Sequence, residues 1–168
     1  MALHRISCLG ALTLPDTSGS VFFEPYPIRA TNDFWKHGNF VFTAAGSKIS
    51  LYSAFRVPNN YVASPTFYVE WTSVTTTGSV IWEVAYRSVG GDDTTSLDQA
   101  TAAETLTIKD AAPTATDRRL FAGVAATASL LGSGSMVEVK LSRDGTSASN
   151  TMAASAQVFD LVLEYSDA

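Results

Sequence analysis

The feature that most constrains the fold is an alternation of apolar and polar residues with a period of two, which recurs along most of the chain. A strand places successive side chains on opposite faces, so this period predicts strands with one buried face. In the clearest case, Phe67, Val69 and Trp71 would lie on one face and the residues between them on the other. A helical period of 3.6 residues is almost absent. Comparable alternation is found in residues 49–57, 80–86, 137–141 and 159–165.

Turn residues separate these runs, and eight or nine short strands with turns between them predict an all-β fold. We expect an antiparallel β-sandwich with a jelly-roll-like topology. Leu120–Leu131 is ambiguous because its alanines would tolerate a helix, but β-branched residues and flanking glycines favour a strand. With 168 residues and no internal repeat, the chain is expected to form a single domain over 1–168, with an extended docking arm at about 20–38. Less regular strands are expected near residues 4–14, 39–43, 104–109 and 118–130.

One predicted hairpin has a chemical consequence. If the turn at residues 75–78 joins two paired strands, Trp71 faces Trp82, and Glu70 faces Glu83 on the other side of the sheet. Cross-strand neighbours lie about 4.5–5.5 Å apart at Cβ, close to the carboxyl spacing of retaining glycosidases. This pair is the best catalytic candidate. The simpler interpretation is that the two carboxylates point into water or meet a nearby arginine, and no catalytic residue is assigned.

The composition excludes several classes of partner. The net charge of −5 repels phosphate groups, so neither nucleic acid nor an anionic membrane is expected to bind. No stretch approaches 18 apolar residues, so no membrane span is expected. Met1–Leu14 lacks a clean hydrophobic core followed by a cleavage site, and we do not interpret it as a signal peptide.

No cofactor or metal is expected. Cys8 is the single cysteine, and the two histidines, His4 and His37, lack the spacing of metal ligands. One acidic loop could gather a Ca²⁺ ion, but it lacks the residue order and the glycine of known calcium loops. We interpret it as an unliganded loop. Its acidic residues are Asp92, Asp93 and Asp98.

An aromatic segment before the regular strands is the predicted partner-binding site. Its two prolines favour an extended path, and its aromatic residues are Phe22, Phe23, Tyr26, Phe34 and Trp35. These side chains could cap an open end of the sandwich. They could also anchor a partner protein, since aromatic residues are enriched at interface centres. A third use is as a stacking platform for a sugar ring.

Several short strings in residues 40–165 together carry a resemblance to a known group of proteins. They look like the small jelly-roll structural proteins of tailed bacteriophages, which serve as head decoration (cement) proteins, head fibres or tail adhesin tips. The resemblance implies a homotrimer on the capsid surface of a virion, bound to the major capsid protein after folding in the host cytoplasm. It implies no catalytic residue. The strings are Phe42-Thr43-Ala44-Ala45, Phe55-Arg56-Val57-Pro58 with Tyr61, Phe67-x-Val69-x-Trp71, Gly78-x-Val80-x-Trp82-x-Val84, Leu141-x-Arg143-Asp144 and Val158-Phe159-x-Leu161-x-Leu163-Glu164-Tyr165.

Three hypotheses follow. The first is a non-enzymatic capsid decoration protein that stabilises the major capsid shell as a homotrimer through the aromatic segment. The alternative is a carbohydrate-binding tail adhesin or carbohydrate-binding module that recognises host surface glycans. Dense burial of all three tryptophans, Trp35, Trp71 and Trp82, would rule out this alternative. The third is a small glycoside-acting enzyme that uses Glu70 and Glu83.

Overall fold

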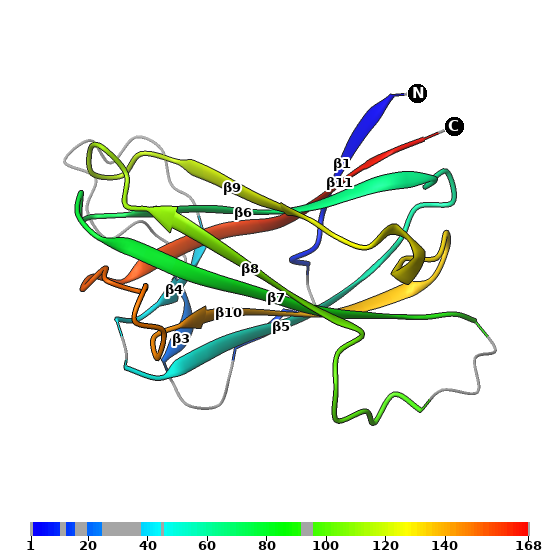
Figure 1. The fold of residues 1–168 in the computed structure, drawn as a ribbon, viewed down its shortest axis with the longest axis horizontal. Helices are drawn as coiled ribbons and strands as arrows, with labels where there is room; N and C mark the ends of the chain where they lie inside the picture. Colours follow the sequence, from blue (N-terminus) through cyan, green and yellow to red (C-terminus); the bar gives the residue numbers. More distant parts are fainter. Residues whose placement is uncertain are drawn as a thin grey trace.

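The chain folds into two antiparallel β-sheets packed face to face, as seen in a computed structural model (Figure 1). The structure describes residues 2–10, 13–15, 20–24, 38–44, 46–91 and 96–167. The expected all-β sandwich is confirmed. Among the described residues the strands are β1 (Leu3–Ser7), β2 (Leu14–Pro15), β3 (Val21–Glu24), β4 (Asn39–Phe42), β5 (Lys48–Arg56), β6 (Ala63–Ser73), β7 (Ser79–Val89), β8 (Glu104–Ala111), β9 (Leu120–Ala125), β10 (Met136–Asp144) and β11 (Ala156–Ser166).

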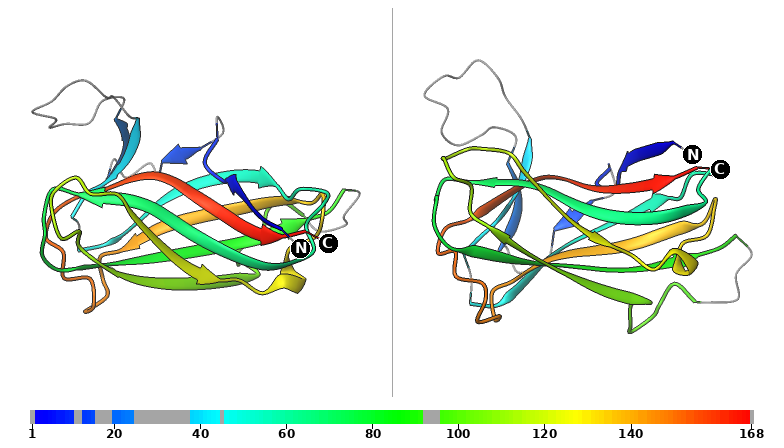
Figure 2. Two further views of the ribbon diagram at one scale, coloured as in Figure 1. Left: turned by 90° about the horizontal axis from the view of Figure 1, so that it is seen from above. Right: turned by 45° about the horizontal axis from the view of Figure 1, so that its top comes forward.

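The strands divide into a six-stranded and a five-stranded sheet. The six-stranded sheet has the order β3-β4-β11-β6-β9, with β1 also paired to β11, and the five-stranded sheet has the order β2-β5-β10-β7-β8. Figure 2 shows the two layers and the two chain ends beside each other. The ends are close because β1 pairs with β11, from Leu3 opposite Ser166 to Ser7 opposite Val162.

The core lies between the sheets and is built from the apolar phase of the alternating runs. Phe67, Val69 and Trp71 of β6 are fully buried, as the alternation predicted. From the other sheet, Trp82 meets Trp71 edge to face with the ring centroids 5.7 Å apart. Such aromatic pairs stabilise a core beyond the area that they bury. Cys8 is also buried, and this burial raises the pKa of its thiol.

The predicted hairpin between β6 and β7 is wrong. The two strands lie in different sheets, and residues 74–78 cross from one sheet to the other. Gly78 has a φ of +90°, and a Cβ there would lie 2.7 Å from the Cα of Met152. The connection therefore needs a glycine, and it forms an arch instead of a two-stranded turn. Trp71 and Trp82 do meet, but across the core and not along one sheet.

The less regular segments differ from expectation in their bounds. The strand expected over residues 4–14 ends at Ser7, and Leu14–Pro15 is a separate short strand. Leu120–Leu131 begins as strand β9 and continues into a 3₁₀ turn, Ala128–Leu130. In the predicted docking arm, Val21–Glu24 forms β3 and pairs with β4, whereas residues 25–37 lie outside the described residues. No helix in the described part of the chain is long and apolar enough to cross a membrane.

Candidate functional site

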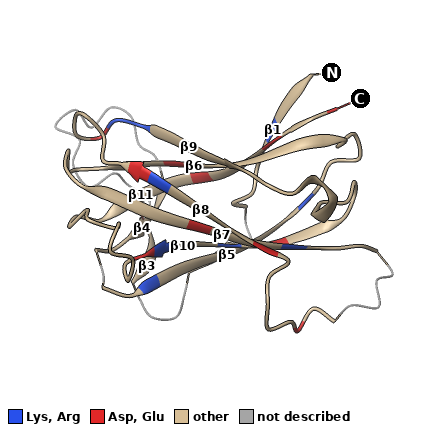
Figure 3. Cartoon of the chain, viewed as in Figure 1, with Lys and Arg blue, Asp and Glu red and all other residues tan. Residues whose placement is uncertain are grey.

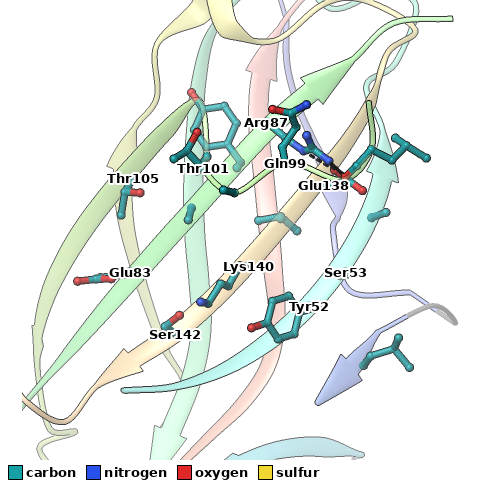
Figure 4. A pocket seen from close by; sticks show the side chains of 18 of the residues that line it. Tyr52, Ser53, Glu83, Arg87, Gln99, Thr101, Thr105, Glu138, Lys140 and Ser142 are labelled. Carbon is teal, nitrogen blue, oxygen red and sulfur yellow. Dashed lines mark hydrogen bonds and ion pairs between the residues drawn. The ribbon is translucent and has the colours of Figure 1, made fainter. Parts of the chain in front are cut away.

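An open groove of about 640 Å³ runs over the outer face of the five-stranded sheet (Figure 4). Its floor is formed by side chains in the polar phase of β5, β7, β8 and β10. Residues 97–102, in the connection from β7 to β8, contribute a wall. Leu14 of β2 also lines it, so the groove combines residues from six separate parts of the chain. The lining residues used below are Leu14, Lys48, Tyr52, Ala54, Glu83, Ala85, Arg87, Gln99, Thr101, Thr105, Glu138 and Lys140.

The strand register sets one row of residues across the floor. Leu14 pairs with Tyr52, Tyr52 with Lys140, Lys140 with Ala85, and Ala85 with Thr105. Directly paired residues on antiparallel strands point to the same face, so all five belong to the outer face of the sheet. The small side chain of Ala85 leaves space beside Lys140, on the side away from Tyr52. This row is the centre of the groove.

Tyr52 is the aromatic residue at this centre, and 43% of its surface is exposed. The Nζ atom of Lys140 lies 5.5 Å from the centroid of the Tyr52 ring, within the range of a cation–π contact. Figure 4 shows the two side chains next to each other on neighbouring strands. An exposed ring beside polar groups offers an apolar surface and hydrogen-bonding partners at the same place.

Two ion pairs lie on either side of the central row. Lys48 donates to Glu83 across 2.6 Å, and this hydrogen bond raises the pKa of the Lys48 ammonium. Arg87 pairs with Glu138 at 2.5 Å on the neighbouring strand. Basic and acidic residues are interspersed along the strands of the sheet (Figure 3). The two carboxylates of the floor are therefore both engaged by cations of the floor.

Arg87 also positions the wall of the groove. Its guanidinium donates to the carbonyl oxygen of Ser96, at 3.2 Å, and to that of Leu97. The same side chain thus connects Glu138 on the floor to the first described residues of the wall. This connection places Gln99 and Thr101 above the floor, where both line the groove.

The predicted aromatic site is only partly within the described residues. Phe22 and Phe23 lie on β3 and are 42% and 56% exposed, and the Phe23 ring meets Phe40 edge to face. Tyr26, Phe34 and Trp35 lie outside the described residues. The structure does not bring Phe22 or Phe23 into the groove. A binding role for these five aromatic residues stays a prediction.

The carboxylate pair proposed for glycoside hydrolysis does not form. Glu70 and Glu83 belong to different sheets and to opposite outer faces, since the inward phases of β6 and β7 face each other. Glu70 is paired with Arg119, away from the groove, and Glu83 with Lys48. The glycosidase hypothesis is therefore wrong.

The acidic loop provides no metal site within the described residues. Asp98 is exposed, while Asp92 and Asp93 lie outside the described part. In that part, no group of three or more His, Cys, Asp or Glu side chains is arranged to hold a metal ion.

Tyr52 was not among the residues predicted to bind a partner, although its place in the alternating pattern marks it as exposed. In residues 49–57 this tyrosine occupies the polar phase of the strand, between Ser50 and Ala54. An aromatic residue in the polar phase of an amphipathic strand is placed on the solvent side. Its partner Lys140 could not be found in this way, because β5 and β10 are far apart in the sequence.

Solved structures with the same fold include several carbohydrate-binding modules. The CBM35 from Cellvibrio japonicus Abf62 has a TM-score of 0.57 and 10% identity, covering 99% of this chain and 95% of that chain. The family 35 module from Clostridium thermocellum has a TM-score of 0.55 and 11% identity, with 99% of both chains covered. CsCBM6-3 from Clostridium stercorarium, in complex with cellobiose, has a TM-score of 0.50 and 9% identity, covering 98% and 94%. No family model and no curated protein matches the sequence.

These matches correct the resemblance to the structural proteins of tailed bacteriophages. The fold is that of carbohydrate-binding modules over nearly the whole chain, and the matched modules are themselves covered almost completely. The resemblance is therefore wrong, and so is the capsid decoration function that depended on it. Short alternating strings such as Phe67-x-Val69-x-Trp71 follow from the packing of any sandwich, so they do not distinguish between sandwich families. The homotrimer, the capsid partner and the virion location were expected only because of this resemblance. With the resemblance gone, they have no support.

Proposed function

We propose that this chain is a non-catalytic carbohydrate-binding module whose ligand occupies the groove on the five-stranded sheet. The observation that carries the proposal is the exposed Tyr52 ring on the floor of a groove, with the Lys140 ammonium beside it. The solved modules that share the fold support the choice of ligand class, because they are described as binding modules and one holds cellobiose.

The chemistry of the groove suits a sugar. A sugar ring has an apolar face of C–H groups and an edge of hydroxyl groups, so it needs a flat apolar surface beside donors and acceptors. Tyr52 supplies the flat surface, Lys140 supplies a donor directly beside it, and Gln99 and Thr105 supply further polar groups elsewhere in the groove. The groove is open to solvent, so sugar units of a longer chain can extend beyond it on either side.

The same groove is poorly suited to hydrolysis. Glycoside hydrolysis commonly requires one carboxyl group that donates a proton and a second that acts as base or nucleophile. Glu83 and Glu138 are each held by a cation, Lys48 and Arg87 respectively. Both carboxylates are thus engaged in ion pairs within the floor, and neither is arranged with the other as a pair of free carboxyl groups. The groove therefore favours binding over bond cleavage.

The test is the affinity of Tyr52 variants for glycans. We expect the wild-type chain to bind members of a panel of neutral and acidic polysaccharides in affinity electrophoresis. Tyr52→Ala should weaken that binding at least about tenfold, the loss typical of a central aromatic contact. Tyr52→Phe should retain most of it, because the ring is kept. Wild-type affinity in Tyr52→Ala would contradict the proposal.

Phe22 and Phe23 define the matched control surface. Both are exposed aromatic residues outside the groove, on β3. Replacing both with Ala should leave glycan binding unchanged if the groove is the site. If this double variant loses binding while Tyr52→Ala does not, the glycan site lies at the aromatic segment instead.

A further inference from the structure

The charges that line the groove do not cancel. Its charged residues are three cations, Lys48, Arg87 and Lys140, and two anions, Glu83 and Glu138. The groove thus has one positive charge in excess, on a chain whose net charge is −5. A positive groove on an acidic protein is a local exception that would concentrate anions at this place.

The excess charge is located at Lys140. Each groove carboxylate is within ion-pair distance of another cation, Glu83 of Lys48 and Glu138 of Arg87. Among the described residues, no carboxylate lies within 4 Å of the Lys140 ammonium. Its neighbours in the central row are Tyr52 and the small Ala85. Lys140 is therefore a cation in the middle of the groove with space beside it and no anionic partner in the described part of the chain.

We infer that the groove selects acidic glycans, with an anionic substituent of the sugar paired to Lys140 while the sugar ring stacks on Tyr52. This inference rests on the proposed function and narrows its ligand class. The Nζ atom of Lys140 and the Tyr52 ring are 5.5 Å apart, so one substituted sugar unit can reach both. A lysine ammonium is a point charge without the planar fork of arginine, so it suits a carboxylate or a sulfate ester equally.

The two flanking ion pairs sharpen this selectivity. They hold the negative charges of Glu83 and Glu138 against Lys48 and Arg87, which reduces their repulsion of an incoming anion. The net negative charge of the rest of the surface repels anionic polymers. An acidic glycan is therefore attracted electrostatically at the groove and repelled elsewhere on the molecule. A neutral glycan would use Tyr52 and the polar groups of the groove, but it would gain nothing from the charge of Lys140.

The experiment compares polysaccharides that differ only in the substituent. Wild-type chain, Lys140→Gln and Arg119→Gln are titrated with polygalacturonate and its carboxyl-reduced form, and with dextran sulfate and dextran. Arg119→Gln removes the same charge from the outer face of the opposite sheet, where its side chain is 65% exposed. We expect the wild type and Arg119→Gln to bind the acidic member of at least one pair about three- to tenfold more tightly. Lys140→Gln should lose that preference, and 0.5 M salt should reduce it in the wild type.

Each outcome has a defined meaning. A preference for only one pair identifies the substituent as a carboxylate or a sulfate. Equal affinity of the wild type for both members of each pair would overturn the inference and leave the proposed function standing. A preference for the acidic member that survives in Lys140→Gln would have the same consequence. Absence of binding to all four polymers and to the wider glycan panel would overturn the proposed function and the inference together.

Discussion

Arg143 shows how a single side chain can determine the position of a whole loop. It lies in β10 and is only 1% exposed, and burial lowers the pKa of its guanidinium. Its Nε atom also donates to the Asn150 side chain at 3.4 Å. Buried polar groups need such partners, and here one cation satisfies several backbone oxygens at once. The carbonyl acceptors belong to Phe42, Thr43, Met152 and Ala154, at 3.4, 3.3, 2.5 and 2.8 Å.

Replacing Arg143 with Met should lower the free energy of unfolding by about 2–4 kcal/mol. The methionine fills much of the space but donates no hydrogen bond, so buried carbonyl groups lose their donor. Urea unfolding followed by circular dichroism measures the loss. Arg118→Met is the control, because Arg118 is exposed and its change should stay within about 0.5 kcal/mol. A loss of that small size for Arg143→Met would show that the loop does not depend on the guanidinium.

At the scale of the element, β9 is adapted to a tyrosine on the neighbouring strand. Gly123 of β9 pairs directly with Tyr68 of β6, and the tyrosine ring occupies the space where a side chain at residue 123 would lie. A Cβ at Gly123 would be 2.4 Å from Cε1 of the ring. The ring stacks on Phe121 with the centroids 4.4 Å apart, and the Tyr68 hydroxyl donates to Glu164 at 3.3 Å. The glycine thus permits a contact that joins three strands.

Gly123→Ala should therefore lower the free energy of unfolding by about 1–3 kcal/mol, because the ring must move. In a Tyr68→Ala background the same substitution should cost much less, since the obstructing ring is gone. Gly46→Ala serves as the control, because a Cβ there meets no atom within 4 Å. Equal costs in both backgrounds, measured by urea unfolding, would refute the steric explanation.

At the scale of the whole molecule, one core serves both sheets. Trp71 comes from the six-stranded sheet and Trp82 from the five-stranded sheet, and both are completely buried where the sheets meet. Phe42 adds a further contact across the core, 5.3 Å from Trp82 between ring centroids. Neither sheet can keep its apolar face covered if the other unfolds.

Unfolding should consequently be a single cooperative transition. Tryptophan fluorescence of a Trp35→Phe variant reports Trp71 and Trp82 at the junction of the sheets, because the chain has three tryptophans. Far-UV circular dichroism reports the strands themselves. The two denaturation midpoints should coincide, and separate midpoints would show that the sheets unfold independently.

The candidate site could be predicted from the sequence only in part. Tyr52 can be recognised as a solvent-facing aromatic residue, because period two assigns it to the polar phase of its strand. Its position beside Lys140 cannot be recognised, since alternation specifies the face of a strand and not its neighbour. The predicted pairing of Glu70 with Glu83 was wrong for the same reason. A turn-like segment between two amphipathic strands fits a hairpin and an arch equally, and the close approach of Gly78 to Met152 selects the arch.

The sequence by itself determined that the chain is an all-β sandwich, which residues face its core, and that Trp71 and Trp82 are buried. These properties depend on local periodicity and on the removal of apolar side chains from water, and both can be read along the chain. Only the tertiary structure decided which strands share a sheet, and therefore which polar side chains gather in the groove. Those pairings join strands distant in the sequence, and they are selected by the packing of the two sheets and the geometry of the connections between them.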